Sequence, residues 1–546
     1  MDLVLVGLPG GGKSAAGRRL ARLHGAEVVD LDEVIAAGAG RPIAAIFDEE
    51  GEAGFRDRER AAVATLGPAD AEPGLRRVIS TGGGAPIDPR NRWLLYRGRH
   101  VAWLDAPAEV LAQRIRRSPS PRPLLAGRDP IGKMRELAAA RARFYAPALR
   151  VNGIVGLAGV VKALERHVDD PIAEGTTLLR AQTAIGRYEL GEGNAVAGVL
   201  AALAALEARR AILVSEPRAW EVAGSALADG LAAAGVPVDH ILLPEGEAAK
   251  QMAVVEGAAR ELARLRAERS DPLIAIGGGA LGDAAGFLAA TWLRGVPVIH
   301  VPTTLVAQID SAIGGKTAVD LPEGKNLVGA FHQPAAVVVD VRFLRTLPAR
   351  QLRAALGEAV KMAALGDERL FELLEAEGPA IAAGEARVHA NGALAEVVER
   401  CGWAKIEVVT ADEREQGARI HLNLGHTLGH AIEAAARYEG ILHGEAVAYG
   451  LRAVCRIGVA VEVTPPERAT RVEALLDALD LGRAPLPYPL HEVLAAMVTD
   501  KKHAGGRLRW VLPTAAGVTV RSDVPDETVE AAARGVLAAA DAGAPG

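Results

Sequence analysis

The chain has 546 residues, enough for roughly three or four folding units at about 150 residues per domain. Lys and Arg number 62 against 68 Asp and Glu, so the formal net charge is -6 and provides no overall positive field for nucleic acid. Apolar residues make up 50% and charged residues 24%, which excludes an intrinsically disordered chain. We therefore expect a globular protein that binds neither DNA nor RNA.

The sequence also argues against membrane insertion and secretion. No apolar run reaches the roughly 20 residues that span a bilayer. Met1 is followed directly by an apolar segment at residues 3–6, without the basic stretch of a secretory signal. The two cysteines, Cys401 and Cys455, are too few for a disulfide framework. These features predict a cytoplasmic protein without membrane association.

Short apolar segments alternate with helical stretches through the first two thirds of the chain. In the first part, strands are predicted at residues 3–6, 27–30, 78–80 and 101–104, with a helix at 13–23. A second alternation has predicted strands at residues 211–214, 239–243, 273–276, 298–301 and 336–340. This βαβ rhythm predicts two parallel sheets covered by helices. Beyond Pro348, helical periodicity dominates, apart from a strand pair near residues 507–512 and 518–521.

These patterns predict three domains. The first is an α/β domain at residues 1–168. Charge, proline and glycine then mix without a period, and we place a linker at 169–177. A Rossmann-like α/β domain at 178–346 and a mainly helical domain at 347–546 complete the chain.

A phosphate-binding motif opens the first domain. Residues 7–14, GLPGGGKS, fit G-x-x-x-x-G-K-[ST] between a predicted strand and a predicted helix. Backbone N–H groups of Gly10, Gly11 and Gly12 would surround a phosphate at the helix N-terminus. Lys13 would offset charge at the β and γ oxygens, and Ser14 would ligate Mg²⁺. The motif predicts a nucleotide site and leaves the phosphoryl acceptor open.

Five motifs follow the phosphate loop in a fixed order. They are DLD at residues 30–32, GEAGFR at 51–56, STGGGA at 80–85, RPLL at 122–125 and RARFY at 141–145. Taken singly, each arginine is more often a solvated surface charge. Together, over residues 1–165, the motifs resemble shikimate kinase. The resemblance implies an α/β P-loop kinase that phosphorylates shikimate with Mg²⁺ and ATP.

The resemblance also implies residue roles. Asp32 would hold substrate hydroxyls and orient the attacking oxygen, while Asp30 would join Ser14 near Mg²⁺. Arg56 and Arg141 would clamp the substrate carboxylate bidentately. The other implied residues are Gly82, Gly83 and Gly84 against the substrate ring, Arg114 at ATP, and Arg122 on a lid over the transferring phosphate. Arg143 stands where the family usually has proline, which questions the local helix geometry.

The second part of the chain combines a glycine turn, cations and candidate metal ligands. Residues 277–283, GGGALGD, contain G-x-G-x-x-G after a predicted strand and before a predicted helix. Three cations suit an anionic ligand and are predicted on glycine-rich loops: Arg294, Lys316 and Lys325. An i,i+4 histidine pair is structural about as often as it binds metal. Here the pair is His426 and His430, which a helix would place on one face. Adding Glu358 and His443 supplies a possible His/His/Glu metal set that leaves one coordination position open.

These strings, from LPEGEAAK at 243–250 to DKK at 500–502, are similar to 3-dehydroquinate synthase over residues 178–540. The resemblance implies zinc, or cobalt, held by Glu358, His426 and His443. It implies NAD binding by Glu216, Glu247, Lys250, Gly279, Asp283, Thr303, Thr304, Lys316, Lys325, Phe343 and Thr346. It implies substrate binding by Arg294, Lys316, Asn326, Lys361, Lys405, Arg419, Asn423, His430 and Lys501, with the Glu415 carboxylate supporting them. Among these, Lys316, Arg419 and His430 would also be catalytic. In the kinase, the catalytic residues would be Lys13, Asp32 and Arg122.

One position departs from the synthase pattern. The first ribose-facing turn has Glu216 where the family usually has Asp. An NADP site would place an arginine at the 2′-phosphate, and Arg218 lies close in sequence, but the carboxylate at Glu216 favours NAD.

The synthase resemblance implies conversion of 3-deoxy-D-arabino-heptulosonate 7-phosphate to 3-dehydroquinate and phosphate. NAD would oxidise one hydroxyl transiently, phosphate would leave, the hydride would return, and an aldol step would close the ring. Two alternatives stay open: another small-molecule P-loop kinase fused to an NAD/zinc polyol dehydrogenase or a related sugar-phosphate cyclase, and a chain in which one module is non-catalytic. We expect only small-molecule substrates, with a homodimer through the synthase module as the candidate assembly.

Overall fold

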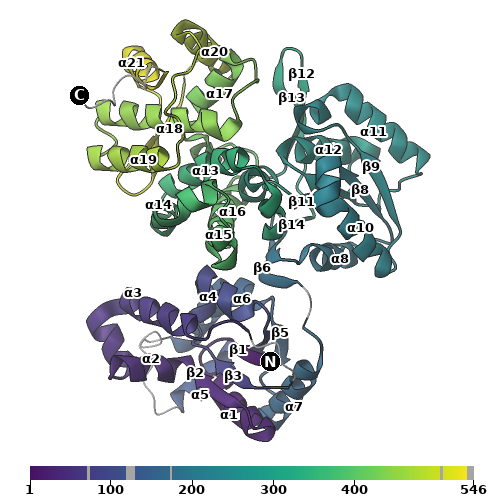
Figure 1. The fold of residues 1–546 in the computed structure, drawn as a ribbon, viewed down its shortest axis with the longest axis vertical. Coiled ribbons are helices and arrows are strands. Elements are labelled where there is room, and N and C mark those ends of the chain that lie inside the picture. The colour runs from purple at the N-terminus through teal and green to yellow at the C-terminus, as the bar shows by residue number, and fades with distance from the viewer. Residues whose placement is uncertain (70–73, 118–128, 173–174, 504–507, 538–546) are drawn as a thin grey trace. The chain divides into compact units, whose positions relative to one another are not determined.

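The computed structural model describes residues 1–69, 74–117, 129–172, 175–503 and 508–537 (Figure 1). The chain folds into two compact units. The first unit comprises Met1–Gln182 and Tyr188–Asn194, and the second comprises Thr183–Arg187 and Ala195–Gly546. The division falls in a hairpin formed by β6 (Thr176–Thr183) and β7 (Gly186–Glu192).

The first unit is built on a five-stranded parallel sheet. Its order is β2-β3-β1-β4-β5, so the first strand lies in the centre. The strands are β1 (Asp2–Val6), β2 (Glu27–Asp30), β3 (Arg77–Ser80), β4 (His100–Asp105) and β5 (Leu149–Asn152). The connections are α1 (Lys13–His24), α2 (Leu31–Ala39), α3 (Ile43–Ala64), η1 (Ala85–Ile87), α4 (Pro89–Tyr96), α5 (Ala108–Arg116), α6 (Pro130–Tyr145) and α7 (Gly156–Asp169). The four strands predicted from the sequence are all present.

The second unit contains five parallel strands in the order β14-β11-β10-β8-β9. They are β8 (Ala211–Ser215), β9 (Val238–Leu242), β10 (Leu273–Gly277), β11 (Val298–Pro302) and β14 (Ala336–Asp340). The helices of this part are α8 (Ala195–Ala205), α9 (Pro217–Ala219), η3 (Trp220–Gly224), α10 (Ser225–Ala233), η4 (Gly246–Lys250), α11 (Met252–Arg264), α12 (Gly279–Thr291), η5 (Trp292–Arg294), η6 (Ala307–Ser311) and η7 (Val341–Thr346).

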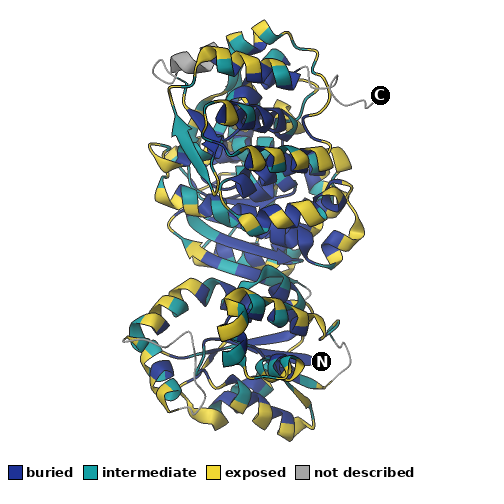
Figure 2. Ribbon diagram, turned by 90° about the vertical axis from the view of Figure 1, so that its left-hand side faces the viewer, coloured by how far each residue is buried: buried dark blue, intermediate teal, exposed yellow. Residues whose placement is uncertain are grey.

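Alternate side chains of these strands point to opposite faces of the sheet, and each face has its own core. Ile212 and Val214 pack with α11 and α12, whereas Leu213 packs with α8 and α10. Because both faces are covered, these strands read as continuous apolar runs rather than as an apolar and polar alternation. Figure 2 shows buried strands beneath helices whose outer sides are exposed.

The rest of the second unit is mainly helical, as predicted. Its helices are α13 (Ala349–Ala364), α14 (Glu368–Ala382), α15 (Ala386–Ala390), α16 (Ala393–Ala411), η8 (Ala418–Asn423), α17 (His426–Ala435), α18 (His443–Ala460), α19 (Pro466–Ala478), α20 (Leu490–His503) and α21 (Asp526–Leu537). The predicted strand pair is β15 (Trp510–Pro513) with β16 (Val518–Arg521). The predicted fold class is confirmed.

The structure corrects one local prediction. Lys316 and Lys325 were expected on glycine-rich loops, but they belong to an antiparallel hairpin of β12 (Lys316–Leu321) and β13 (Gly324–Phe331). Glycines and charges within a short two-stranded ribbon conceal its strand character, because neither face of the hairpin is fully buried. Arg294 lies in η5 rather than in a loop.

The domain limits at 168, 177 and 346 stay predictions. The predicted linker covers the last residue of α7 and the first residues of β6, and includes residues 173–174, which lie outside the described residues. Within the described ranges, no helix has the length and apolar character needed to cross a membrane.

Candidate active sites

The phosphate loop of the first unit joins the central strand to α1. Strand β1 ends at Val6, and α1 begins at Lys13 directly after Gly12, which has a left-handed backbone with φ of 86°. The Lys13 ammonium donates to Gly7 O at 2.8 Å and Leu8 O at 3.1 Å, so its charge is held over the loop. Gly10 and Gly11 belong to the same turn. The loop and the N-terminus of α1 have the geometry that could hold an anion.

The candidate Mg²⁺ residues converge at the ends of β2 and β3. Ser14 Oγ lies 3.3 Å from Ser80 Oγ, and Ser80 is the register partner of Asp30. Asp30 Oδ1 also accepts the Asp32 N–H at 3.2 Å and caps α2. Asp32 therefore lies in the first turn of that helix rather than in the strand.

The glycine loop at residues 82–84 lies against the predicted shikimate residues. A Cβ added at Gly82 would be 3.1 Å from Asp32 Oδ1, and one at Gly84 would collide with the Arg56 guanidinium. Arg141 donates to Gly83 O at 3.0 Å. The structure therefore brings together Asp32, Arg56, Arg141 and the three glycines, as the sequence predicted.

Two residues that sequence reasoning did not assign support this loop. Glu59 is 1% exposed and pairs with Arg56 at 2.8 Å. Burial raises the pKa of Glu59, although Arg56 opposes the shift. The Tyr145 hydroxyl donates to Gly83 O, the acceptor that Arg141 also uses. The i,i+3 spacing of Arg56 and Glu59 on α3 is the sequence feature that could have predicted this ion pair.

The remaining kinase predictions have separate outcomes. Arg114 donates to Gly153 O at 2.8 Å, and Arg122 lies outside the described residues. Helix α6 continues without a break through Arg143, whose guanidinium stacks 4.7 Å from the Phe144 ring centroid. The missing proline therefore leaves the helix intact.

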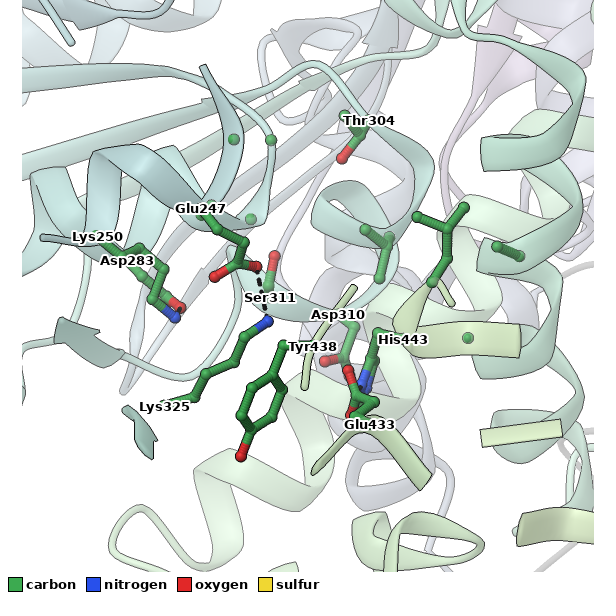
Figure 3. Close-up of a pocket in the computed structure, with 18 of the residues that line it drawn as sticks. Glu247, Lys250, Asp283, Thr304, Asp310, Ser311, Lys325, Glu433, Tyr438 and His443 are labelled. Carbon is green, nitrogen blue, oxygen red and sulfur yellow. Dashed lines mark hydrogen bonds and ion pairs between the residues drawn. The ribbon is translucent and has the colours of Figure 1, made fainter. Parts of the chain in front are cut away.

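The second unit encloses a cavity of about 1430 Å³ (Figure 3). Its walls come from the N-terminus of α12, the β12–β13 hairpin, and helices α17 and α18. Nine residues predicted to bind NAD line it: Glu216, Glu247, Lys250, Gly279, Asp283, Thr303, Thr304, Lys325 and Thr346. Asn326, His430 and His443 line it as well.

One wall of the cavity carries the glycine turn and fixed charges. Strand β10 ends at Gly277 and α12 begins at Gly279, so the N-terminal end of this helix, where backbone N–H groups have no partner within the helix, lines the cavity. Glu216 Oε2 accepts the Gly246 N–H at 3.0 Å. Lys250 pairs with Asp283 at 2.9 Å, and burial nevertheless raises the pKa of Asp283. Figure 3 shows Lys325 reaching Glu247, 3.2 Å away.

The predicted substrate cations are held by acidic and carbonyl oxygens. Asp310, which sequence reasoning did not assign, lies 2.9 Å from Lys405 and 3.7 Å from Lys361. Burial raises the pKa of Asp310, but the two lysines outweigh it and lower that pKa. Further contacts join Lys316 to Glu415, Asn423 to Glu415 at 3.1 Å, and Arg419 to Gly314 O at 3.0 Å.

The candidate metal ligands meet at a buried carboxylate. Glu358 is fully buried, and its Oε1 lies 3.4 Å from His426 Nε2 and 3.1 Å from His443 Nε2. Burial opposes ionisation, but Lys361 and His426 hold the pKa of Glu358 well below its usual value. One nitrogen from each of His426, His430 and His443 lies within 4.8 Å of the others.

The unassigned Glu433 lies behind His443. Its Oε2 is 3.1 Å from His443 Nδ1. Burial would lower the pKa of His443, but Glu358 and Glu433 together raise it to about 10. The signal for Glu433 was its position on α17, seven residues after His426 and three after His430, on one helix face.

Several predicted residues are not among those that line the cavity: Arg294, Lys316, Phe343, Glu358, Lys361, Lys405, Arg419, Asn423 and His426. Arg294 is exposed in η5, and Phe343 packs in the core beneath the sheet. Lys501 lies in α20, and its side chain is outside the described part of the chain.

Family models match most of the chain. Residues 9–152 match shikimate kinase, residues 240–354 match the N-terminal part of 3-dehydroquinate synthase, and residues 355–503 match its C-terminal part. A 3-dehydroquinate synthase from Colwellia psychrerythraea is 44% identical over 295 residues, covering 54% of this chain and 82% of that protein. One from Synechococcus sp. is 41% identical over 354 residues, covering 63% and 94%.

Solved structures with the same fold cover the second unit. A 2-epi-5-epi-valiolone synthase from Streptomyces hygroscopicus, with NAD⁺ and Zn²⁺ bound, has a TM-score of 0.59 and 29% identity, covering 64% of this chain and 96% of that one. A 2-deoxy-scyllo-inosose synthase, complexed with carbaglucose-6-phosphate, NAD⁺ and Co²⁺, has a TM-score of 0.55 and 26% identity, covering 65% and 99%.

Proposed function

This chain belongs to the 3-dehydroquinate synthase family and carries a shikimate kinase domain ahead of the synthase, and from that premise we propose how its residues divide two reactions. It is a bifunctional enzyme of the shikimate pathway. One activity phosphorylates shikimate with ATP. The other converts 3-deoxy-D-arabino-heptulosonate 7-phosphate to 3-dehydroquinate and phosphate.

The observation that carries the synthase assignment is the buried Glu358 carboxylate between the Nε2 atoms of two histidines. Tetrahedral zinc with bonds of about 2.0–2.1 Å separates its ligands by about 3.3 Å, close to the two oxygen-to-nitrogen distances. A carboxylate with two imidazoles is also a common donor set for catalytic zinc. The residues present therefore fit Zn²⁺ or Co²⁺, held by Glu358, His426 and His443. When bound, the metal would act as a Lewis acid toward substrate oxygens.

The cations around this set suit a substrate with a phosphate and a carboxylate. Lys316, Asn326 and Arg419 would bind the anionic ends, while Lys361, Lys405 and His430 would hold hydroxyls. The Asp310 carboxylate lies 2.9 Å from the Lys405 ammonium and 3.7 Å from the Lys361 ammonium and favours the charged form of both, although burial lowers the pKa of Lys405. Arg294 and Asn423 complete the proposed set, as does Lys501.

The opposite wall fits NAD. The glycine turn before α12 would receive the pyrophosphate at the positive end of the helix. Glu216 stands where a carboxylate binds ribose hydroxyls, which favours NAD over NADP. Arg218 lines the cavity beside it, but donates to Thr346 O at 3.1 Å. When bound, NAD accepts and returns a hydride.

In the kinase, the glycine loop held between Asp32, Arg56 and Arg141 carries the assignment. Asp32 would accept a hydrogen bond from the attacking hydroxyl, and the two arginines would hold the carboxylate of shikimate. Lys13 would neutralise charge on the phosphates, with Mg²⁺ near Ser14 and Asp30. Arg114 and Arg122 are proposed at the nucleotide, the latter over the transferred phosphate.

The direct test gives the purified full chain each substrate in turn. We expect ATP-dependent formation of shikimate 3-phosphate, and NAD-dependent release of phosphate from the heptulosonate phosphate. Phosphorylation of another small alcohol, with shikimate inert, would contradict the kinase assignment. Turnover of a neutral polyol, with the sugar phosphate inert, would contradict the synthase assignment.

Two predictions, on binding partners and on cellular location, complete the proposal. Small molecules are the substrates of both families, and we propose that nucleic acid and membranes are not partners and that the synthase part forms a homodimer. Both cysteines are buried and free, which suits the reducing cytoplasm.

A further inference from the structure

Helix α17 presents three side chains on one face toward the candidate metal centre. His426, His430 and Glu433 occupy positions i, i+4 and i+7, which a helix places on the same side. Glu433 is only 8% exposed and lines the cavity with His430 and His443. Figure 3 shows the Glu433 carboxylate directed at the His443 ring. A buried carboxylate in this position needs a partner.

The partner is the far nitrogen of His443. Its Nδ1 lies 3.1 Å from Glu433 Oε2, while its Nε2 lies 3.1 Å from Glu358 Oε1. The ring is therefore fixed at both ends, with one nitrogen toward the metal set and the other toward Glu433. If Nδ1–H donates to Glu433, the Nε2 lone pair is free for a metal.

The second histidine of the set is held differently. His426 Nδ1 lies 3.1 Å from the carbonyl oxygen of Leu424, and its Nε2 lies 3.4 Å from Glu358. Both rings therefore turn the same nitrogen toward Glu358. Only His443 has a charged acceptor behind it, and a carboxylate makes the imidazole a stronger donor to metal than a neutral carbonyl does.

We propose that Glu433 is a positioning residue that fixes the ring and tautomer of His443 for metal binding. The inference rests on the proposed metal site. Outer partners of this kind typically change metal affinity 10–100-fold. Glu433 is not proposed as a ligand, because His443 Nδ1 lies within hydrogen-bond distance of its carboxylate.

The experiment measures zinc affinity in the full chain by competition with a chromogenic chelator, without substrate. Glu433→Gln removes the charge and keeps the shape, and Glu433→Ala removes both. Glu439→Gln is the matched control, an exposed glutamate just beyond α17. We expect zinc binding about 10-fold weaker in Glu433→Gln, weaker still in Glu433→Ala, and unchanged in the control. NAD affinity of the metal-free protein should be unchanged, which shows that the cavity is folded.

Cobalt gives a second measurement on the same variants. The visible absorption of the Co²⁺-loaded chain should shift in Glu433→Gln and stay constant in Glu439→Gln, because the former alters the ligand field at His443. Equal zinc affinity in the two Gln variants overturns the proposal, whether or not Glu433→Ala folds. If His443→Ala leaves zinc binding unchanged, the metal set itself fails, and that outcome is distinct from failure of Glu433 alone.

Discussion

The phosphate loop of the kinase and the charge network of the synthase are assembled over very different distances along the chain. In the kinase, Lys13 bonds to carbonyls five and six residues away. In the synthase, Lys405 bonds to Asp310, Lys316 to Glu415 and Arg419 to Gly314, over 95, 99 and 105 residues. The phosphate loop is one turn between a strand and a helix, whereas the synthase site is a network between a sheet and a helical bundle.

The difference teaches how damage should spread. Substituting one side chain of a local loop should remove only the contribution of that side chain, because the neighbouring residues are positioned by their own backbone. A network of buried and half-exposed charges shares each ion among several partners, so removing one leaves others unpaired. The predictions below test whether the sites act separately, and whether the synthase site is coupled within itself.

The largest effect is expected from loss of the metal set. His443→Ala, or dialysis against a chelator, should lower synthase kcat/KM at least about 10³-fold, because a Lewis acid contributes several kcal/mol. Kinase activity should stay within about twofold once Mg²⁺ is restored in excess. The control is His491→Ala, an exposed histidine near the start of α20. Full synthase turnover in verified metal-free protein would contradict the zinc assignment.

Lys13→Ala makes the reverse separation. Loss of the ammonium over the phosphate loop should lower kinase kcat/KM about 10²–10³-fold, because the charge that offsets the phosphates is removed. Synthase activity should stay within about twofold. Lys162→Ala, an exposed lysine on α7, should change neither rate. A parallel fall in both activities would show that the two sites are not independent.

The same contrast explains what could be predicted from the sequence. The phosphate loop and the parallel strands follow from contiguous motifs and apolar runs. The supporting carboxylates Glu59, Asp310 and Glu433 were not assigned, because no motif marks a carboxylate whose partner is another side chain, here Arg56, Lys405 and His443. For Asp310 and Lys405 the two partners are 95 residues apart, and an acidic residue in isolation predicts only a surface charge. For Glu433, helix periodicity alone would have predicted its position on the same face as His426 and His430.

A smaller effect is expected at the kinase carboxylate clamp. Arg56→Lys or Arg141→Lys should raise the KM for shikimate about 10-fold, since the planar fork is lost at a charged hydrogen bond worth about 1.5–3 kcal/mol. The KM for ATP should stay within about twofold. Arg166→Lys, on the exposed side of α7, serves as the control. Equal weakening of ATP would place these arginines at the nucleotide instead.

Coupling within the synthase site can be measured on the Lys316–Glu415 pair. Lys316→Met, Glu415→Gln and the double variant form a cycle for kcat/KM with the heptulosonate phosphate. Because the lysine is 52% exposed, we expect a coupling energy of only about 0.5–1 kcal/mol. Additive effects would mean that the pair acts as two separate contacts, and the network description would fail there.

The last prediction is that NADH absorbance does not change during synthase turnover, and it distinguishes the two reactions by what each consumes. The kinase should use one ATP for each shikimate, whereas the synthase should need NAD yet accumulate no NADH, because the hydride must return to the same substrate skeleton. The cavity supports this reading: a glycine turn for a dinucleotide lies in the same unit as cations suited to a phosphate that leaves. Polyol dehydrogenases release their product oxidised and would build up NADH in step with substrate. Following NADH absorbance and free phosphate in one cuvette decides between them, since stoichiometric NADH without phosphate would contradict the synthase reaction, and phosphate release at constant absorbance would support it.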